Sequence, residues 1–200
     1  ARRRLPVGPV GLLVVTAVAL LAATLVLRVG LSGGRTEPVD LQDALNEQSQ
    51  TPLVPADAAE AKVGAPAPDV RLAYLDGGSQ QLSELKGTPV VLNFWSSTCA
   101  PCLTEMPALE QFARTHTGAN GTPAVKVLGV DVADSAAAAR KMVMRTGATY
   151  RNAADPNALV FRVFGGTALP RTVVVGADGT VKDVHSGALT ESGLTDLLRR

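Results

Sequence analysis

The sequence predicts an α/β fold with a central, partly parallel sheet and helices on both of its faces. Two short and nearly continuous apolar runs, at residues 88–95 and 124–132, are typical of strands that a sheet buries on both sides. Segments with helical spacing follow each of these runs. This alternation of strands and helices favours a layered sheet whose parallel strands are joined by helices.

The first predicted element is a β-hairpin over residues 69–85, because a weakly alternating segment leads through "DGGS" into a second polar-apolar segment. The buried run 88–95 is the next strand. It leads into the cysteine segment and a helix that carries Met106, Leu109 and Phe112 on one side.

The second half continues the alternation after the buried strand 124–132. A helix over 134–148 has Asp134 or Ser135 as its N-cap and Gly147 as its stop. The last predicted elements are a short helix over 155–166, two strands around "GADG" over 171–187, and a closing helix over 190–200.

Composition excludes some classes of function. The net charge is +1 over 200 residues, so the chain lacks the basic field that nucleic-acid binding needs, and no nucleic-acid partner is expected. Two cysteines are too few for a disulfide-built scaffold.

The N-terminal segment predicts export. Arg2, Arg3 and Arg4 precede an uncharged run over residues 5–27, and a bilayer core needs roughly 20 apolar residues. Residues 1–31 are therefore expected to be a cytoplasmic basic tip and a transmembrane anchor, with the rest outside the cell membrane. A cleaved signal sequence is the alternative, although its apolar region is usually only about 7–15 residues.

The remaining chain divides into a tether and a domain. Residues 32–62 begin with the polar, glycine-containing segment "SGGRTEP", continue with acids and amides and few apolar residues, and predict a flexible linker. Residues 63–200 have the texture of one globular domain.

Both cysteines, Cys99 and Cys102, lie in the stretch "FWSSTCAPCLTEMP". A zinc site needs four ligands, and the other candidates, His116 and His185, have no paired spacing. A c-type haem site needs histidine directly after the second cysteine, where Leu103 stands. A purely structural disulfide is disfavoured, because so small a loop removes little chain entropy. We therefore expect no metal and no cofactor besides the cysteine pair.

A redox pair explains the segment better. The cysteines stand where a buried strand meets a helix, and a helix N-terminus stabilises a thiolate. Pro101 suits the first helical turn. Cys99 is then the exposed nucleophile at the helix tip, and Cys102, one turn further, is the more buried resolving thiol.

Three further residues belong to this candidate site. Glu105 follows Cys102 by three residues, so it is either an acid-base group for that thiol or an ordinary acid in the first helical turn. Pro107 removes a helical hydrogen bond and predicts a kink. Pro170 directly precedes a strand and pushes Leu169 towards an extended conformation, while its own isomer stays open.

Together, "VVLNFWSSTCAPCLTEMP" and "ALPRTVVVGADGTV" resemble the membrane-anchored, extracytoplasmic thioredoxin-like proteins of the TlpA, ResA and CcmG (DsbE) type. The resemblance covers residues 63–200. It implies a thioredoxin fold with an N-terminal β-hairpin extension, in which Pro170 is a cis-proline facing the cysteines. It also implies that Glu105 tunes the thiols and that Asn93 replaces the buried aspartate of cytoplasmic thioredoxins.

The same resemblance implies that Trp95, Thr98, Leu169 and Pro170 form the substrate-binding surface. Thr98 departs from the tryptophan that many relatives carry before the first cysteine, which leaves substrate preference open.

The implied activity is that of a thiol:disulfide oxidoreductase, most specifically a reductant of apocytochrome c cysteines. In an oxidising compartment such a protein needs electrons from a CcdA- or DsbD-like membrane carrier. The alternatives are a general extracytoplasmic disulfide reductase or oxidase for exported proteins, a thiol peroxidase, or a non-catalytic binding module on the same fold. A peroxidase would carry threonine three residues before its cysteine, where this chain has Ser96.

Overall fold

The computed structural model describes residues 53–116 and 124–199. The predicted anchor and most of the predicted linker lie outside these residues. Within the described ranges, no helix combines the length and apolar character needed to cross a membrane.

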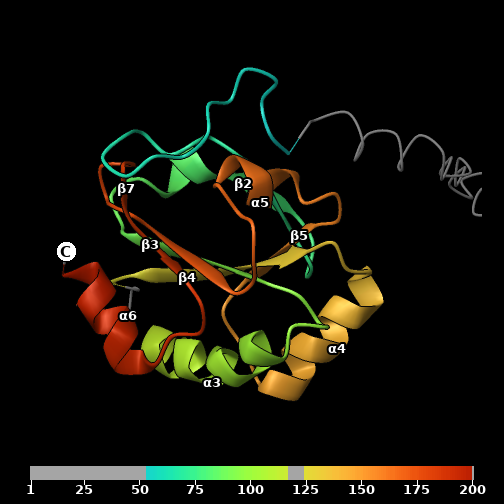
Figure 1. The fold of residues 1–200 in the computed structure, drawn as a ribbon. Coiled ribbons are helices and arrows are strands. Elements are labelled where there is room, and N and C mark those ends of the chain that lie inside the picture. The colour runs from blue at the N-terminus through green and yellow to red at the C-terminus, as the bar shows by residue number, and fades with distance from the viewer. Residues whose placement is uncertain (1–52, 117–123, 200) are drawn as a thin grey trace, which may run out of the picture. The chain divides into compact units, whose positions relative to one another are not determined.

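A seven-stranded mixed sheet forms the centre of the described part, in the order β2-β1-β5-β4-β3-β6-β7 (Figure 1). β4 pairs in parallel with β3 on one side and with β5 on the other, and all other neighbouring strands pair antiparallel. The strands are β1 Arg71–Tyr74, β2 Ser79–Gln81, β3 Val90–Trp95, β4 Lys126–Val132, β5 Asn152–Asp155, β6 Arg171–Val175 and β7 Val181–Ser186. The predicted mixed sheet is therefore confirmed.

The two apolar runs of the sequence are the central strands. Every residue of β3 is buried, and in β4 only Lys126 is partly exposed. Such strands have apolar side chains on both faces because helices cover both faces.

Strand β5 was not among the predicted elements. Its sequence, NAAD, contains no β-branched or aromatic residue. It is a strand because β4 pairs with it on one side and β1 on the other, so backbone hydrogen bonding outweighs its low propensity.

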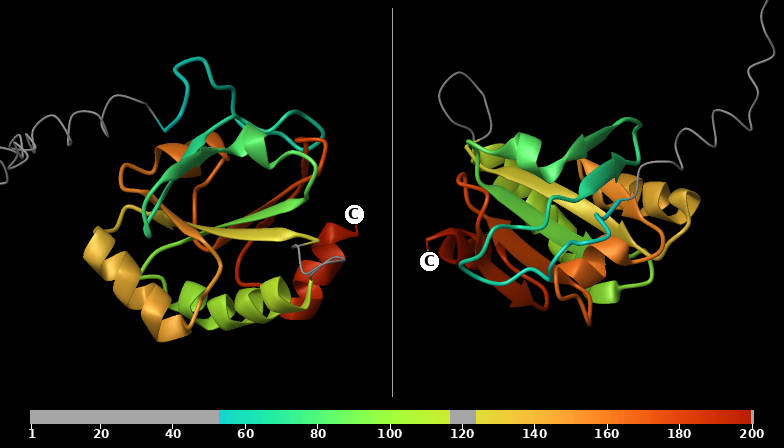
Figure 2. Two further views of the ribbon diagram at one scale, coloured as in Figure 1. Left: turned by 180° about the vertical axis from the view of Figure 1, so that it is seen from behind. Right: turned by 90° about the horizontal axis from the view of Figure 1, so that it is seen from above.

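Four α-helices and one 3₁₀ helix are described: α3 Ala100–Thr115, α4 Ala136–Thr146, α5 Leu159–Val163, α6 Glu191–Leu198 and the 3₁₀ helix Leu82–Leu85. Helices α3, α4 and α6 lie along one face of the sheet, whereas α5 and the 3₁₀ helix lie on the other (Figures 1 and 2). Each face has its own apolar core, one around Trp95 and Phe112 and the other around Phe94 and Phe161. The cap residues match expectation, since Ser135 begins α4 and Gly147, at φ +69°, ends it.

The packed domain begins earlier than the sequence suggested. The carbonyl of Leu53 accepts a hydrogen bond from Arg71 N at 2.8 Å, and Ala61 N donates to the carbonyl of Val163 at 2.8 Å. Leu53, Val54 and Ala61 also pack against the apolar core. The prediction of a flexible linker is therefore wrong for residues 53–62, because their apolar side chains find a matching surface on the domain.

Candidate active site

The cysteine pair sits at the junction of β3 and α3. Cys99 is the N-cap of α3, and its Sγ accepts a hydrogen bond from Cys102 N at 3.2 Å. A disulfide joins the two sulfurs, with 5.3 Å between the Cα atoms. Cys99 is half-buried, whereas Cys102 is completely buried. The two sulfurs therefore differ in access to a second protein, as predicted for a nucleophile and a resolving thiol.

The prolines of α3 lie on its exposed surface. Pro101 occupies the first turn of α3. Backbone N–H groups there have no helical acceptor, so the missing N–H of proline costs no hydrogen bond. Pro107 lies inside the helix, which continues through it to Thr115.

Glu105 lies one turn beyond Cys102 and is only 2% exposed. Its Oε1 accepts a hydrogen bond from Asn93 Nδ2 at 2.7 Å, and its Oε2 accepts one from Leu189 N at 2.9 Å. Burial raises the pKa of Glu105 to about 7, and these two hydrogen bonds oppose that rise only in part. Its carboxyl can therefore take up and release a proton near neutral pH.

Asn93 connects Glu105 to the sheet. Its side chain is completely buried, and Nδ2 donates both to Glu105 and to Thr172 Oγ1, the latter at 3.2 Å. Asn93 lies opposite Thr172 in the β3–β6 pair, which fixes the position of its amide. Nothing in the order of residues along the chain indicated that Leu189 or Thr172 would join this group.

The peptide bond between Leu169 and Pro170 is cis, as the resemblance implied. Pro170 directly precedes β6, and the antiparallel register pairs Phe94 with Arg171. Continuing this register by one residue brings Pro170 beside the end of β3, from which the chain leads to the cysteines. Leu169 is half-buried and Thr98 is exposed, so both are available to a substrate.

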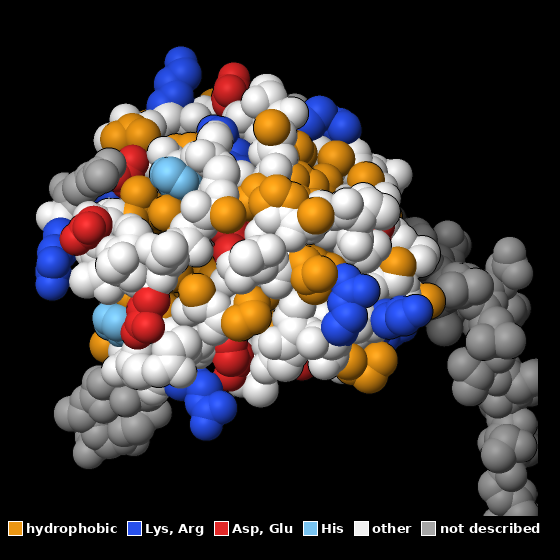
Figure 3. Space-filling view, turned by 60° about the horizontal axis from the view of Figure 1, so that its bottom comes forward, with side chains coloured by type: hydrophobic (Ala, Val, Ile, Leu, Met, Phe, Trp, Pro, Cys, Tyr) orange, Lys and Arg blue, Asp and Glu red, His pale blue; other side chains and the backbone are white. Residues whose placement is uncertain are grey.

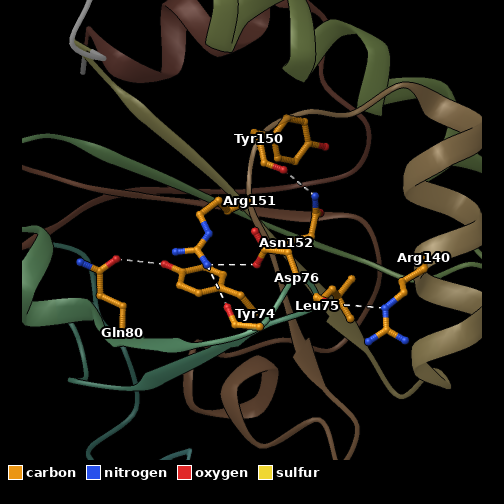
Figure 4. Close-up of polar contacts among 9 residues, drawn as sticks. Tyr74, Leu75, Asp76, Gln80, Arg140, Tyr150, Arg151 and Asn152 are labelled. Atoms are coloured by element: carbon orange, nitrogen blue, oxygen red, sulfur yellow. Dashed lines mark hydrogen bonds and ion pairs between the residues drawn. The ribbon is translucent and has the colours of Figure 1, made fainter. Parts of the chain in front are cut away.

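The predicted contact of Trp95 with substrate is wrong. Trp95 is completely buried, and its Nε1 donates a hydrogen bond to Asn152 Oδ1 at 3.0 Å. Asn152 is held in turn by donating from Nδ2 to the carbonyl of Tyr150 at 2.7 Å (Figure 4). The indole therefore supports the end of β3 from within the core.

A surface pocket of about 380 Å³ lies beside α4 and does not include either cysteine. Leu75, Arg140 and Met144 contribute to its lining, and Arg140 Nε donates to the carbonyl of Leu75 at 3.2 Å (Figure 4). The chemistry of the cysteines thus takes place at an exposed helix tip and outside this pocket.

The described ranges contain no cluster of three or more histidine, cysteine, aspartate or glutamate side chains arranged to hold a metal ion. A small polar network does surround the loop before Cys99. Ser96 Oγ and Thr98 Oγ1 are 3.0 Å apart, and Ser97 N donates to Asp134 Oδ2. Nothing in the sequence indicated that Asp134 would bind this loop, because Asp134 follows β4 and is far from the loop along the chain.

Comparisons with known proteins agree with this geometry. The sequence profile of the Redoxin family matches residues 62–198. The thiol-disulfide oxidoreductase ResA of Halalkalibacterium halodurans is 30% identical over 143 residues, which are 72% of this chain and 79% of ResA. The thiol:disulfide interchange protein DsbE of Xylella fastidiosa is 34% identical over 134 residues, 66% of this chain and 64% of DsbE.

A solved structure extends the comparison to the fold. The crystal structure of a secreted thiol-disulfide isomerase from Corynebacterium glutamicum matches with a TM-score of 0.59 at 29% identity, over 66% of this chain and 81% of that protein. The mixed sheet with flanking helices is thus a thioredoxin fold, with a cysteine pair at the start of α3. The chain belongs to the Redoxin family and is a thiol-disulfide oxidoreductase of the ResA and DsbE type.

Proposed function

We propose that this chain is an extracytoplasmic reductant of protein disulfides, in which Cys99 attacks and Cys102 resolves. The observation that carries the proposal is the unequal burial of the two sulfurs beside a buried carboxyl. Cys99 is half-buried at the helix N-terminus, whereas Cys102 and Glu105 are buried behind it. The positive end of the helix dipole favours the thiolate form of Cys99.

The reaction proceeds in two exchanges. The Cys99 thiolate attacks one sulfur of a substrate disulfide, forms a mixed disulfide and releases the other substrate sulfur as a thiolate that takes a proton. Cys102 then gives its proton to Glu105 and attacks Cys99 Sγ, which releases the second substrate sulfur. Two electrons pass to the substrate, and the pair ends as the Cys99–Cys102 disulfide of the present structure.

After each turnover Glu105 must release the proton that it took from Cys102. This requires a carboxyl that exchanges protons near neutral pH. A pKa of about 7 suits this role, because the group is then neither permanently charged nor permanently protonated. Asn93 and Leu189 N hold its two oxygens, so the acceptor stays beside the thiol between turnovers.

Substrate would dock over Cys99 on the surface formed by Thr98 and Leu169, beside the buried Pro170. The helical side of the molecule, shown in Figure 3, carries acidic, basic and apolar side chains interspersed. Such a mixed surface suits a protein or peptide substrate. Thr98 would leave more room beside the nucleophile than the tryptophan of many relatives.

The finer proposal concerns the compartment and the substrate. The run over residues 5–27 would anchor the chain in the cell membrane with the domain outside, and the name of the Corynebacterium glutamicum protein, a secreted thiol-disulfide isomerase, supports export. Apocytochrome c cysteines are the proposed substrate, on the strength of the family resemblance. The reduced pair would be restored by a CcdA- or DsbD-like carrier, since an oxidising compartment supplies no reductant of its own.

Turnover of disulfides by the full chain tests the activity. The reduced protein is expected to reduce insulin and an oxidised peptide that contains the two cysteines of an apocytochrome c haem site. Cys99→Ser should abolish both reactions. Ala100→Ser is the matched control, because it adds the same hydroxyl at an exposed position between the cysteines without removing a thiol. Equal turnover by the wild type and Cys99→Ser would refute the proposal.

The midpoint potential of the pair tests the direction. A reductant should have a value near that of thioredoxin, about −270 mV, whereas an oxidant should lie near about −120 mV. Preference for the apocytochrome peptide over insulin would support the specific substrate. Equal rates would favour a general reductase of exported proteins.

A further inference from the structure

The loop between β3 and α3 is fixed by a hydrogen bond to a residue from another part of the chain. Cys99 N donates to the carbonyl of Ser96 at 3.1 Å, which closes a turn around Ser97. The middle of this turn is fixed by Asp134, whose Oδ2 accepts the hydrogen bond from Ser97 N. Asp134 lies just before α4, so the β4–α4 connection is tied directly to the residue pair that precedes the nucleophile.

A second carboxyl lies against Asp134. Asp131 is at the end of β4, opposite Trp95 in the β3–β4 pair, and is 1% exposed. A hydrogen bond with Asp134 is among the causes that raise the pKa of Asp131. Among the described residues, Oδ1 of Asp131 has no hydrogen-bond partner. Two carboxyls form a hydrogen bond only when one of them carries a proton, so the pair is built to share one.

The backbone between Asp131 and Asp134 makes a strained turn at Ala133. Ala133 has φ +57°, in the left-handed region that residues with a Cβ atom avoid. In a straight strand, side chains three residues apart point to opposite faces, whereas this turn returns Asp134 towards Asp131. Ala133 N donates to the carbonyl of Asp155 at 3.1 Å, which holds the turn.

The charged groups around Asp131 all favour its protonated form. Burial raises the pKa of Asp131 to about 8, and the hydrogen bond with Asp134 and the charges of Asp134 and Asp155 add to the effect. Asp155, on β5, is bound at both oxygens by Leu159 N and Phe161 N at 2.8 Å, and Arg162 acts on it from α5. From the β3–α3 loop, the Ser97 N–H donates to this pair at Asp134 Oδ2.

We propose that Asp134 is a positioning residue for Cys99 and that a proton on Asp131 keeps Asp134 bound to the Ser97 N–H. The inference rests on the proposed function, because it takes Cys99 as the attacking thiol. When Asp131 loses its proton, two adjacent carboxylates repel each other. The half-buried Asp134 then turns to solvent, Ser97 N loses its acceptor and the loop no longer fixes Cys99.

The test is the rate at which Cys99 attacks a small aromatic disulfide, measured against pH in the full chain carrying Cys102→Ser. This rate first rises with pH as the Cys99 thiol ionises. We expect it to fall again above about pH 8 by a factor on the order of ten, because misplacement of a reacting group is costly. Asp131→Asn should remove the fall, since its amide donates to Asp134 at every pH. Asp134→Ala should lower the rate on the order of tenfold throughout.

Glu110→Gln is the matched control. Glu110 is another buried carboxyl that accepts a backbone hydrogen bond, from Thr149 N at 2.6 Å, and it has no contact with the loop before Cys99 among its hydrogen bonds. The rate of Cys99 attack in Glu110→Gln should depend on pH in the same way as in the protein that carries Cys102→Ser alone. An alkaline fall that persists in Asp131→Asn, or an unchanged rate in Asp134→Ala with a native circular dichroism spectrum, would overturn the inference. No reaction of Cys99 at any pH would instead refute the proposed function.

Discussion

Replacing Glu105 by glutamine removes a buried acid while keeping the size of the side chain. Glu105 is 2% exposed, and its pKa rises from 4.5 to about 7, chiefly because burial disfavours the carboxylate. At pH values below the pKa of Glu105 in the unfolded chain, the carboxyl is protonated in both the folded and the unfolded chain. Glu105 then does not lower the free energy of unfolding. Between about pH 4.5 and pH 7 the unfolded chain releases it while the folded chain retains it, so stability from this group is lost as pH rises through this window.

The shift sets the magnitude of the effect. About 2.5 pKa units correspond to about 3 kcal/mol of unfolding free energy. We therefore expect the wild type to lose about 3 kcal/mol relative to Glu105→Gln between about pH 4 and pH 8. The contribution of Asp131 is common to both proteins and cancels in this difference.

The assay is urea unfolding of both proteins in their oxidised form, in which the disulfide prevents the cysteines from titrating. Stability is measured at several pH values, and the difference between the two proteins is plotted against pH. A difference that does not change from about pH 4 to pH 8 would show that folding leaves the pKa of Glu105 unshifted, contrary to this prediction. In the reduced proteins, Glu105→Gln should also slow resolution of a Cys99 mixed disulfide about 10²-fold near neutral pH.

Two further substitutions test the support of the site. In Gly129→Ala, the new Cβ would lie 1.9 Å from Asn152 Oδ1 and 2.7 Å from Trp95 Nε1, so the Trp95–Asn152 hydrogen bond should break. We expect a loss of about 3 kcal/mol in urea unfolding, and an unchanged midpoint would contradict this contact. Ala133→Gly removes the strain of φ +57° and should raise the unfolding free energy by about 0.5–1 kcal/mol, whereas a loss would argue against a left-handed residue there.

The sequence predicted best the elements whose own residues carry the pattern. Strands β3 and β4 are buried on both sides and have the expected continuous apolar runs. The N-cap of α4 at Ser135 and the stop at Gly147 depend on local backbone chemistry, so they were visible as well. The cysteine pair at a strand–helix junction was predicted for the same reason.

What could not be predicted depends on partners distant in the chain. β5 is a strand only because β1 and β4 flank it. Trp95 lies near the cysteines in sequence, yet its side chain points into the core towards Asn152, 57 residues away. The spacing of Glu105 left two interpretations open, and the contact with Leu189 N, 84 residues further on, supports the acid-base one by burying the carboxyl.

Trapping of the mixed disulfide shows which of the two cysteines attacks the substrate. Reduced Cys102→Ala and Cys99→Ala proteins are each mixed with a disulfide-bonded peptide, and the adducts are identified by mass spectrometry. We expect a stable adduct on Cys99 in Cys102→Ala, and almost none in Cys99→Ala, because Cys102 is completely buried. An adduct on Cys102 that forms as fast as the one on Cys99 would contradict the assignment of nucleophile and resolving thiol.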